Sequence, residues 1–357
     1  MSDWGKGVNN DIGWGQGGTN DIGYGSIYAV SNSGLTLLLK DNTAFIIEVK
    51  TDNAGTSNDN QFQFTGAVGD YDVVAKQNDI VVATFNDLSD EETITFANGA
   101  GTYVLEVTPK EVNGFNRINF NETGDISKIL DIKQWGTCVW SSFADAFSGC
   151  GDILTNVSDI PDLSNVTSLE SMFGLTTIST INRINEWNTS GILNMQDMFF
   201  FSEQFNQPLS FDTSSVTNMS RMFRVSGQNS SLSFDTSSVE DMSFMFEDSA
   251  FNQPLNFNTS SVTDMSRMFR VNFSFNQDIG GFDVSNVTDL SNFMQDKTSE
   301  NFSATNYDSI LNSWSSQSVQ SNLTLNMGTI KHTSAGLAGR NTLINTYNWT
   351  ITDGGQV

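Results

Sequence analysis

Two rows of short polar side chains recur between residues 210 and 283, and they are the side chains best placed to bind a ligand. They stand in repeated stretches such as PLSFDTSSVTNMSRMF and PLNFNTSSVTDMSRMF. At the spacing of neighbouring parallel strands, such groups can hydrogen-bond sugar hydroxyls or share a Ca²⁺ ion. An equally weighted alternative is an exposed β face whose polar side chains bind no ligand and serve only solubility. These predicted ligand rows are Asp212, Asp235, Asn258 and Asp283, and beside them Ser210, Ser233 and Asn256.

Residues that could catalyse a reaction are scarce. His332 is the only histidine, and it stands in a KHTSAG segment without a nucleophile signature. Among 41 acidic residues no spacing singles out a pair for glycoside hydrolysis, and no GxxxxGK[ST] phosphate loop occurs. We therefore predict a protein that is not an enzyme and has no cofactor, with a polysaccharide depolymerase as the last-ranked alternative.

The polar rows belong to a sequence repeat. The closing aromatic residues Phe223, Phe246 and Phe269 are spaced 23 apart, and looser copies end at Phe173, Phe199 and Met294. A unit of this length cannot enclose a core alone, so each copy must bury its apolar side against its neighbours. The repeat predicts a solenoid.

Within one copy, two kinds of element are expected. Leu255 and Phe257 alternate with asparagines, which is the period of a half-buried strand that stacks in parallel with its neighbours. The following apolar residues fall at helical spacing and predict an amphipathic turn or two of helix: Val262, Met265, Met268 and Phe269. We interpret the methionines as deformable core filler in preference to a partner groove.

Two further rows are interpreted as structural. Arg224, Glu247 and Arg270 predict an alternating-sign ladder of exposed ion pairs, each worth at most about 1 kcal/mol. Aligned asparagines predict a buried spine that satisfies backbone groups between repeats: Asn206, Asn229, Asn252 and Asn276.

The first 28 residues carry a different repeat, WGKGVNNDIG, WGQGGTNDIG and YGSIY, with Trp4, Trp14 and Tyr24 in register. So much glycine is entropically costly to order, yet evenly spaced aromatics are unusual in a linker. We interpret the segment as an anchor that folds on a partner. The alternative is a flexible leader whose aromatics cover a neighbouring domain.

Between residues 35 and 120, six β-branched and aromatic runs alternate with Asn, Gly and Asp clusters and predict a β-sandwich. The dipeptides Asn98-Gly99 and Asn113-Gly114 favour tight turns between strands.

The net charge limits the classes of partner, and the cysteine content limits the disulfides that can form. The chain has 16 Lys and Arg against 41 Asp and Glu, a net charge of -25, which disfavours nucleic acid and anionic bilayers and favours a neutral, cationic or sugar partner. No signal sequence or membrane-spanning run is expected. Cys138 and Cys150 are too few for a disulfide scaffold, and reduced thiols are favoured over a bridge.

Several segments carry a family resemblance: TDNAGTSNDNQ, GTYVLEV, RINFNETGDISKILDIKQWG, the NVT..M..MF repeats and a final NLTLNMGTIKHTSAGLAGRNTLINTYNWTITDGG. From about residue 44 to 355 the chain resembles the BspA-like leucine-rich-repeat surface proteins of Bacteroidetes, although it lacks their usual secretion signal and WGDG-type turn. The N-terminal WGxG and NDIG repeat is similar instead to structural proteins of tailed phages of the same hosts. That second resemblance implies a virion protein made in the host cytoplasm.

We accordingly predict a mainly β chain with short helices. The expected parts are an anchor (1–30), an immunoglobulin-like or PKD-like sandwich (31–123), a leucine-rich-repeat-type parallel solenoid (124–297) and a C-terminal cap (298–357). The expected function is a virion fibre or capsid decoration, a homotrimer with an adhesive surface that attaches to a host glycan or protein. A bacterial cell-surface adhesin is the second hypothesis.

Overall fold

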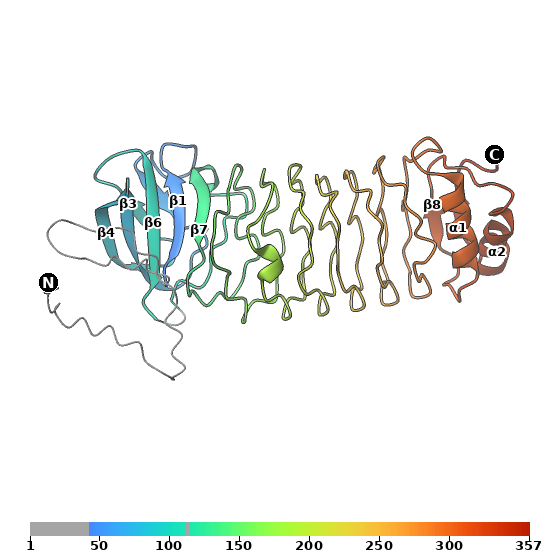
Figure 1. The fold of residues 1–357 in the computed structure, drawn as a ribbon, viewed down its shortest axis with the longest axis horizontal. Coiled ribbons are helices and arrows are strands. Elements are labelled where there is room, and N and C mark those ends of the chain that lie inside the picture. The colour runs from blue at the N-terminus through green and yellow to red at the C-terminus, as the bar shows by residue number, and fades with distance from the viewer. Residues whose placement is uncertain (1–42, 112–113) are drawn as a thin grey trace, which may run out of the picture. The chain divides into compact units, whose positions relative to one another are not determined.

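The computed structural model describes residues 43–111 and 114–357, which belong to one compact unit. The chain there is mainly β, with two α-helices, and Figure 1 shows a sheet, a stack of repeats and the two helices in chain order. The predicted anchor residues Trp4, Trp14 and Tyr24 lie outside the described residues.

Seven strands precede the repeats, and six of them fall on the runs that the sequence predicts. They are β1 (Phe45–Lys50), β2 (Gln61–Gln63), β3 (Asp70–Gln77), β4 (Ile80–Ser89), β5 (Thr93–Thr95), β6 (Thr102–Pro109) and β7 (Ile129–Gln134). A five-stranded antiparallel sheet has the order β4-β3-β6-β1-β7, and β2 pairs with β5 in a second, two-stranded sheet. Strand β7, which lies beyond the predicted runs, completes the edge next to the repeats.

Alternating burial explains why these runs form strands. In β3 the residues Tyr71, Val73 and Ala75 are buried, and their neighbours in sequence are half-buried or exposed. Such alternation places one face of the sheet on a core. Asn98-Gly99 follows β5 and Gly99 has a positive φ of 86°, but the predicted tight hairpin is wrong, because β5 pairs with β2 while β6 lies in the other sheet. Asn113 lies outside the described residues.

The core of the sheet continues into the repeats without a break. Phe45 of β1 lies 6.2 Å from Trp135 and 5.2 Å from Trp140, measured between ring centroids. Trp135 in turn packs on Phe147, the first residue of the phenylalanine column of the repeats. A parallel bridge between Asp131 of β7 and Leu154 joins the sheet to the first repeat.

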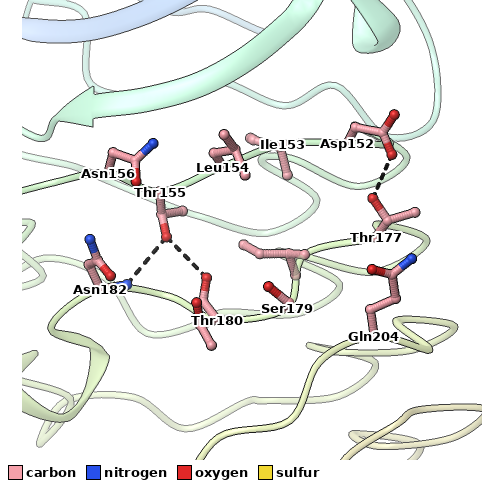
Figure 2. Close-up of a pocket in the computed structure, with 11 residues that line it drawn as sticks. Asp152, Ile153, Leu154, Thr155, Asn156, Thr177, Ser179, Thr180, Asn182 and Gln204 are labelled. Atoms are coloured by element: carbon pink, nitrogen blue, oxygen red, sulfur yellow. Dashed lines mark hydrogen bonds between the residues drawn. The ribbon is translucent and has the colours of Figure 1, made fainter.

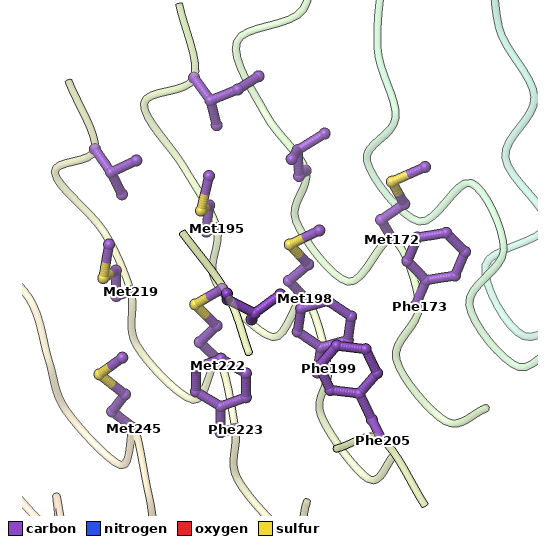
Figure 3. Packing of buried hydrophobic residues seen from close by; sticks show 14 of the residues in the cluster. Met172, Phe173, Met195, Met198, Phe199, Phe205, Met219, Met222, Phe223 and Met245 are labelled. Carbon is purple, nitrogen blue, oxygen red and sulfur yellow. The ribbon is translucent and has the colours of Figure 1, made fainter. Parts of the chain in front are cut away.

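The repeats stack in parallel through their backbones and their aromatic side chains. Single parallel bridges connect one repeat to the next, for example Asn218 to Asp241 and Asp241 to Asp264. The phenylalanine rings form a buried column with centroid separations of 5.7–6.4 Å, and methionines pack beside it (Figure 3). The column contains Phe147, Phe173, Phe199, Phe223, Phe246 and Phe269.

The predicted helical turn within each repeat is wrong, although its apolar residues are buried as expected. Arg267 and Val271 both have positive φ, which a right-handed helix does not tolerate. Alternate N–H groups donate to the next repeat instead of to their own turn, as Met219 does to Asp241 (2.9 Å) and Phe223 to Met245 (3.0 Å). Stacking therefore takes the backbone hydrogen bonds that a helix would need.

The predicted strand in each repeat does not form: in those segments a single bridge joins Leu209 to Leu232, whereas bridges such as Asp241 to Asp264 lie in the segment predicted to be helical. Leu255 and Phe257 are buried and Asn256 and Asn258 are exposed, so the predicted alternation holds. No strand is assigned within the described repeats between β7 and β8. Short 3-10 turns occur at η1 (Ile126–Lys128) and η2 (Ile184–Glu186).

The last described segment packs two helices against the end of the stack. It consists of α1 (Ala304–Ser315), β8 (Thr324–Asn326), α2 (Leu337–Tyr347) and β9 (Thr350–Thr352), with β8 and β9 parallel. The Ser303 hydroxyl caps α1 by accepting the N–H of Asn306 at 3.1 Å. The single histidine, His332, is buried here, and its Nδ1 lies 2.8 Å from the carbonyl oxygen of Thr333.

Candidate functional site

The predicted ligand rows lie on the surface as expected, but their acceptor groups have a structural use. Six of the seven side chains are exposed and Asp283 is half-buried. Asp212 Oδ1 accepts both the N–H (2.9 Å) and the hydroxyl (2.7 Å) of Ser214, and Asp235 does the same with Ser237. Asn258 and Asp283 also accept the N–H of the residue two positions on, so these four side chains each cap a turn that follows the surface segment.

These local hydrogen bonds also stabilise the charged form of the carboxylates. The N–H and hydroxyl of Ser214 hold the pKa of Asp212 below its usual range, and Ser237 and Ser285 act in the same way on Asp235 and Asp283. The carboxylates therefore stay ionised, each with one oxygen committed to a turn.

A row of buried threonines lies directly behind the ligand rows, and the sequence argument missed it. The hydroxyl of Thr213 donates to the carbonyl oxygen of Asp235 at 2.9 Å, and Thr236 donates to that of Asn258 at 2.9 Å. Thr189 and Thr259 make the equivalent bonds. The TSS triplet that follows Asp212, Asp235 and Asn258 was the signal that could have revealed this row.

The alternating-sign ladder exists, but its central carboxylate is buried. Glu247 accepts from Arg224 on one side and from Arg270 on the other, the latter at 2.9 Å, and its side chain is only 2% exposed. Arg270 also reaches Asp296 at 3.3 Å. The prediction of exposed pairs was wrong for Glu247, because two arginines from adjacent repeats cover it.

The asparagine row links neighbouring repeats as predicted, but it lies nearer the surface than predicted. The side-chain oxygens of Asn206, Asn229 and Asn252 each accept the N–H of the equivalent asparagine in the next repeat, at 2.8–3.0 Å. These side chains are exposed or half-buried and not buried as predicted. The row therefore works as a spine along the surface.

Three depressions in the surface lie elsewhere, over the first repeats. They have volumes of about 230, 270 and 280 Å³ and follow one another. The first two share the lining residues Thr177 and Gln204, and the last two share Leu175, so the three depressions are neighbours, and we call them together the array groove. None of the predicted ligand rows lines it.

The first part of the array groove is a polar basin between two adjacent repeats (Figure 2). Thr177 donates to Asp152 at 2.7 Å at one end, where Gln204 also lies. Thr155 donates to the carbonyl of Thr180 and accepts the N–H of Asn182, both at 3.3 Å, at the other end. Hydroxyl and amide groups dominate this basin.

The remaining parts add aromatic and charged groups. Phe201 lines the second depression and is 45% exposed, and Phe200 lines the third. The Arg224 guanidinium lies over the Phe200 ring at 5.3 Å, and Arg221 pairs with Asp197 at 3.0 Å. Aromatic faces and paired charges thus lie side by side in one feature.

Unequal repeat length explains the position of the array groove. Phe147, Phe173 and Phe199 are spaced 26 residues apart, whereas Phe223, Phe246 and Phe269 are 23 apart. The longer repeats contribute the segments around Thr155, Thr180 and Gln204 that form its walls. Sequence reasoning centred on the regular copies and passed over this irregularity.

Cys138 and Cys150 are buried and free, and burial raises the pKa of both thiols, that of Cys138 to about 12. Within residues 43–111 and 114–357 there is no group of three or more His, Cys, Asp or Glu side chains that could hold a metal ion. In the same ranges no helix has the length and apolar character to cross a bilayer.

The stacked repeats, their polar rows and the C-terminal helices define a mainly β repeat protein. The family whose model matches, described as "Mycoplasma protein of unknown function, DUF285", covers residues 141–233 and 226–329, more than half of the chain. This protein belongs to that family, which is associated with BspA-like surface repeats. No curated protein and no solved structure shows a match.

Proposed function

We propose that this protein is a non-enzymatic virion structural protein of a tailed phage, which displays its repeats as an adhesive surface toward the host cell. Residues 1–30 would attach it to other virion proteins, through Trp4, Trp14 and Tyr24. The strands β1–β7 would act as a spacer of immunoglobulin-like or PKD-like type. The repeats would form a leucine-rich-repeat-type parallel solenoid.

The observation that supports display is the stacking of the repeats. Each one bonds to the next through parallel bridges and a shared phenylalanine column, so equivalent surface side chains recur at a regular spacing. A periodic surface suits attachment to a partner that itself repeats, because many weak contacts combine into strong avidity.

A bacterial cell-surface adhesin is the second candidate function. The matched family is associated with BspA-like surface repeats, and this association favours the adhesin. The match covers the repeats, which would bind the host in both candidate functions. The two candidates differ in what the N-terminal segment is attached to.

Imaging of phage particles tests the first proposal. A cryo-EM map of intact particles from a phage that encodes this chain should show it on the head or the tail. Its absence from purified particles, with its presence on the host surface, would replace the first candidate by the second. A reducing-end assay on host capsule tests the non-enzymatic part, since release of sugar ends would contradict it.

A further inference from the structure

We propose that the array groove binds an uncharged oligosaccharide, and that this groove, in preference to the predicted ligand rows, is the adhesive site of the protein. The inference rests on the proposed adhesive function and adds to it the place of binding and the chemistry of the ligand. The groove residues that carry it are Leu154, Thr177, Phe200, Phe201, Gln204 and Arg221.

The shape fits an extended ligand. The three depressions follow one another, with Thr177 and Gln204 lining the first two and Leu175 lining the last two, and their lining residues come from several adjacent repeats. Each depression has about 230–280 Å³, which suits one or two sugar rings, and a series of three neighbouring depressions suits a short chain of them.

Each depression also supplies an apolar surface for a ring face. Leu154, which is 55% exposed, lines the first and Phe201 lines the second, while Leu175 and Phe200, whose ring carries the Arg224 guanidinium on one face, line the third. The C–H groups on one face of a pyranose ring are apolar and pack on aromatic or aliphatic side chains, while the hydroxyls point sideways. Phe200 and Phe201 are held edge to face at 5.6 Å, so they present two differently oriented surfaces.

The polar groups favour a hydroxyl-rich ligand without net charge. Hydroxyls need both donors and acceptors, and the groove provides both through Thr177, Asn182, Gln204 and the Arg221–Asp197 pair. An anionic chain would meet four carboxylates and only two guanidiniums: Glu122, Asp152, Asp197 and Glu203 against Arg221 and Arg224. Arg221 and Arg224 share their depression with Glu122 and Asp197, so the positive and negative groups there are equal in number.

The predicted ligand rows are less suited to the task. Asp212, Asp235 and Asp283 each have a carboxylate oxygen committed to a turn of their own repeat. They bring no aromatic surface, whereas the groove has open side chains such as Phe201 and Gln204, both of which are exposed. The groove is therefore the better surface for a sugar ring.

Calorimetric titration of the full-length chain tests the inference. The probes are hexasaccharides of glucose, mannose, galactose and N-acetylglucosamine, with a hexauronate and hexalysine for comparison. We expect binding of at least one neutral hexasaccharide, weakened about tenfold or more by Phe201→Ala. Gln204→Ala should weaken it as well. Phe273→Ala is the matched control, because Phe273 is 53% exposed and does not line the groove.

Three results would overturn the inference. They are equal loss of binding in Phe201→Ala and Phe273→Ala, binding of only the hexauronate or hexalysine, and loss of binding only in an Asp212→Ala, Asp235→Ala, Asp283→Ala triple variant.

Adsorption to host cells distinguishes a failure of the inference from a failure of the proposed function. If Phe201→Ala adsorbs as well as the natural chain, the groove is not the adhesive site while the function stands, and if the natural chain does not adsorb, the adhesive function itself is wrong.

Discussion

Half-buried polar side chains between stacked repeats show how single residues adjust the stability of the stack. Asp241, Asp264 and Asp289 lie on neighbouring repeats linked by parallel bridges, and each accepts the N–H of the residue two positions on, at 2.7–2.8 Å. Earlier repeats have Asn194 and Asn218 in the same row. The row thus needs an acceptor oxygen but not a charge.

Replacing Asp264 by asparagine should stabilise the protein at neutral pH. Burial, and after it the charges of Asp241 and Asp289, raise the pKa of Asp264. The folded state then holds the proton more tightly than the unfolded state, so this residue favours folding at low pH and the contribution is lost as pH rises through the folded pKa. Asp264→Asn keeps the acceptor for Ser266, and the melting temperature should rise more at pH 7 than at pH 4. An equal rise at both values would contradict the charge argument.

A buried lysine at the end of the stack should change the stability with pH in the opposite direction. Lys297 donates to the carbonyl oxygens of Asn272 and Phe275, and its Nζ lies 5.7 Å from the Phe302 ring. Burial lowers its pKa from 10.5 to about 7. The unfolded state then binds more protons between these values, so the stability should rise as the pH increases from 7 toward 10.

The variant Lys297→Met should remove this part of the pH dependence, because methionine has no proton to lose. Urea unfolding at pH 6, 8 and 9.5 measures it. Lys331→Met, at an exposed position, is the control and should leave the profile unchanged. A profile that is identical in Lys297→Met and in the natural chain would show that Lys297 is not the group responsible.

At the scale of the repeat, the phenylalanine column holds neighbouring units together. Phe246 is fully buried and lies 5.8 Å from Phe223, 5.7 Å from Phe269 and 4.3 Å from Phe251. Phe246→Ala should cost about 3–5 kcal/mol of unfolding free energy, because the cavity opens between two stacked units. Phe273→Ala, which truncates an exposed ring, should cost far less, and similar losses in chemical denaturation would contradict the column as the main link.

Backbone spacing between repeats gives a second prediction at this scale. A Cβ on Gly227 would lie 2.1 Å from the carbonyl oxygen of Glu203, whereas a Cβ on Gly281 would meet nothing within 4 Å. Gly227→Ala should therefore lower the melting temperature by several degrees, as the repeats must shift apart. Gly281→Ala should be neutral or slightly stabilising, since it restricts the unfolded chain.

At the scale of the whole molecule, attachment and adhesion should be separable. We expect the full-length chain to form a homotrimer, by analogy with the symmetry of phage fibres. Deletion of residues 1–30 should abolish incorporation into particles and trimer formation while the remaining chain still adsorbs to host cells. Light scattering and particle composition measure the two effects, and a monomeric full-length chain would contradict the trimer.

The sequence by itself determined the mainly β character, the positions of β1–β6 and the burial of the Phe223, Phe246 and Phe269 series, because period-two and 23-residue patterns are local and repeated. It also placed Asp212, Asp235 and Asn258 correctly on the surface. Only the tertiary structure decided how these groups are used. Stacking diverted the backbone hydrogen bonds of the expected helical turn to the next repeat, and turn formation occupied the aspartate oxygens.

The array groove was likewise decided by tertiary structure. It joins Leu154, Thr177, Phe201 and Gln204, residues from successive repeats whose contact depends on how the longer copies fold over one another. A difference of three residues in repeat length is visible in the sequence, but its consequence for shape exists only once the repeats are stacked.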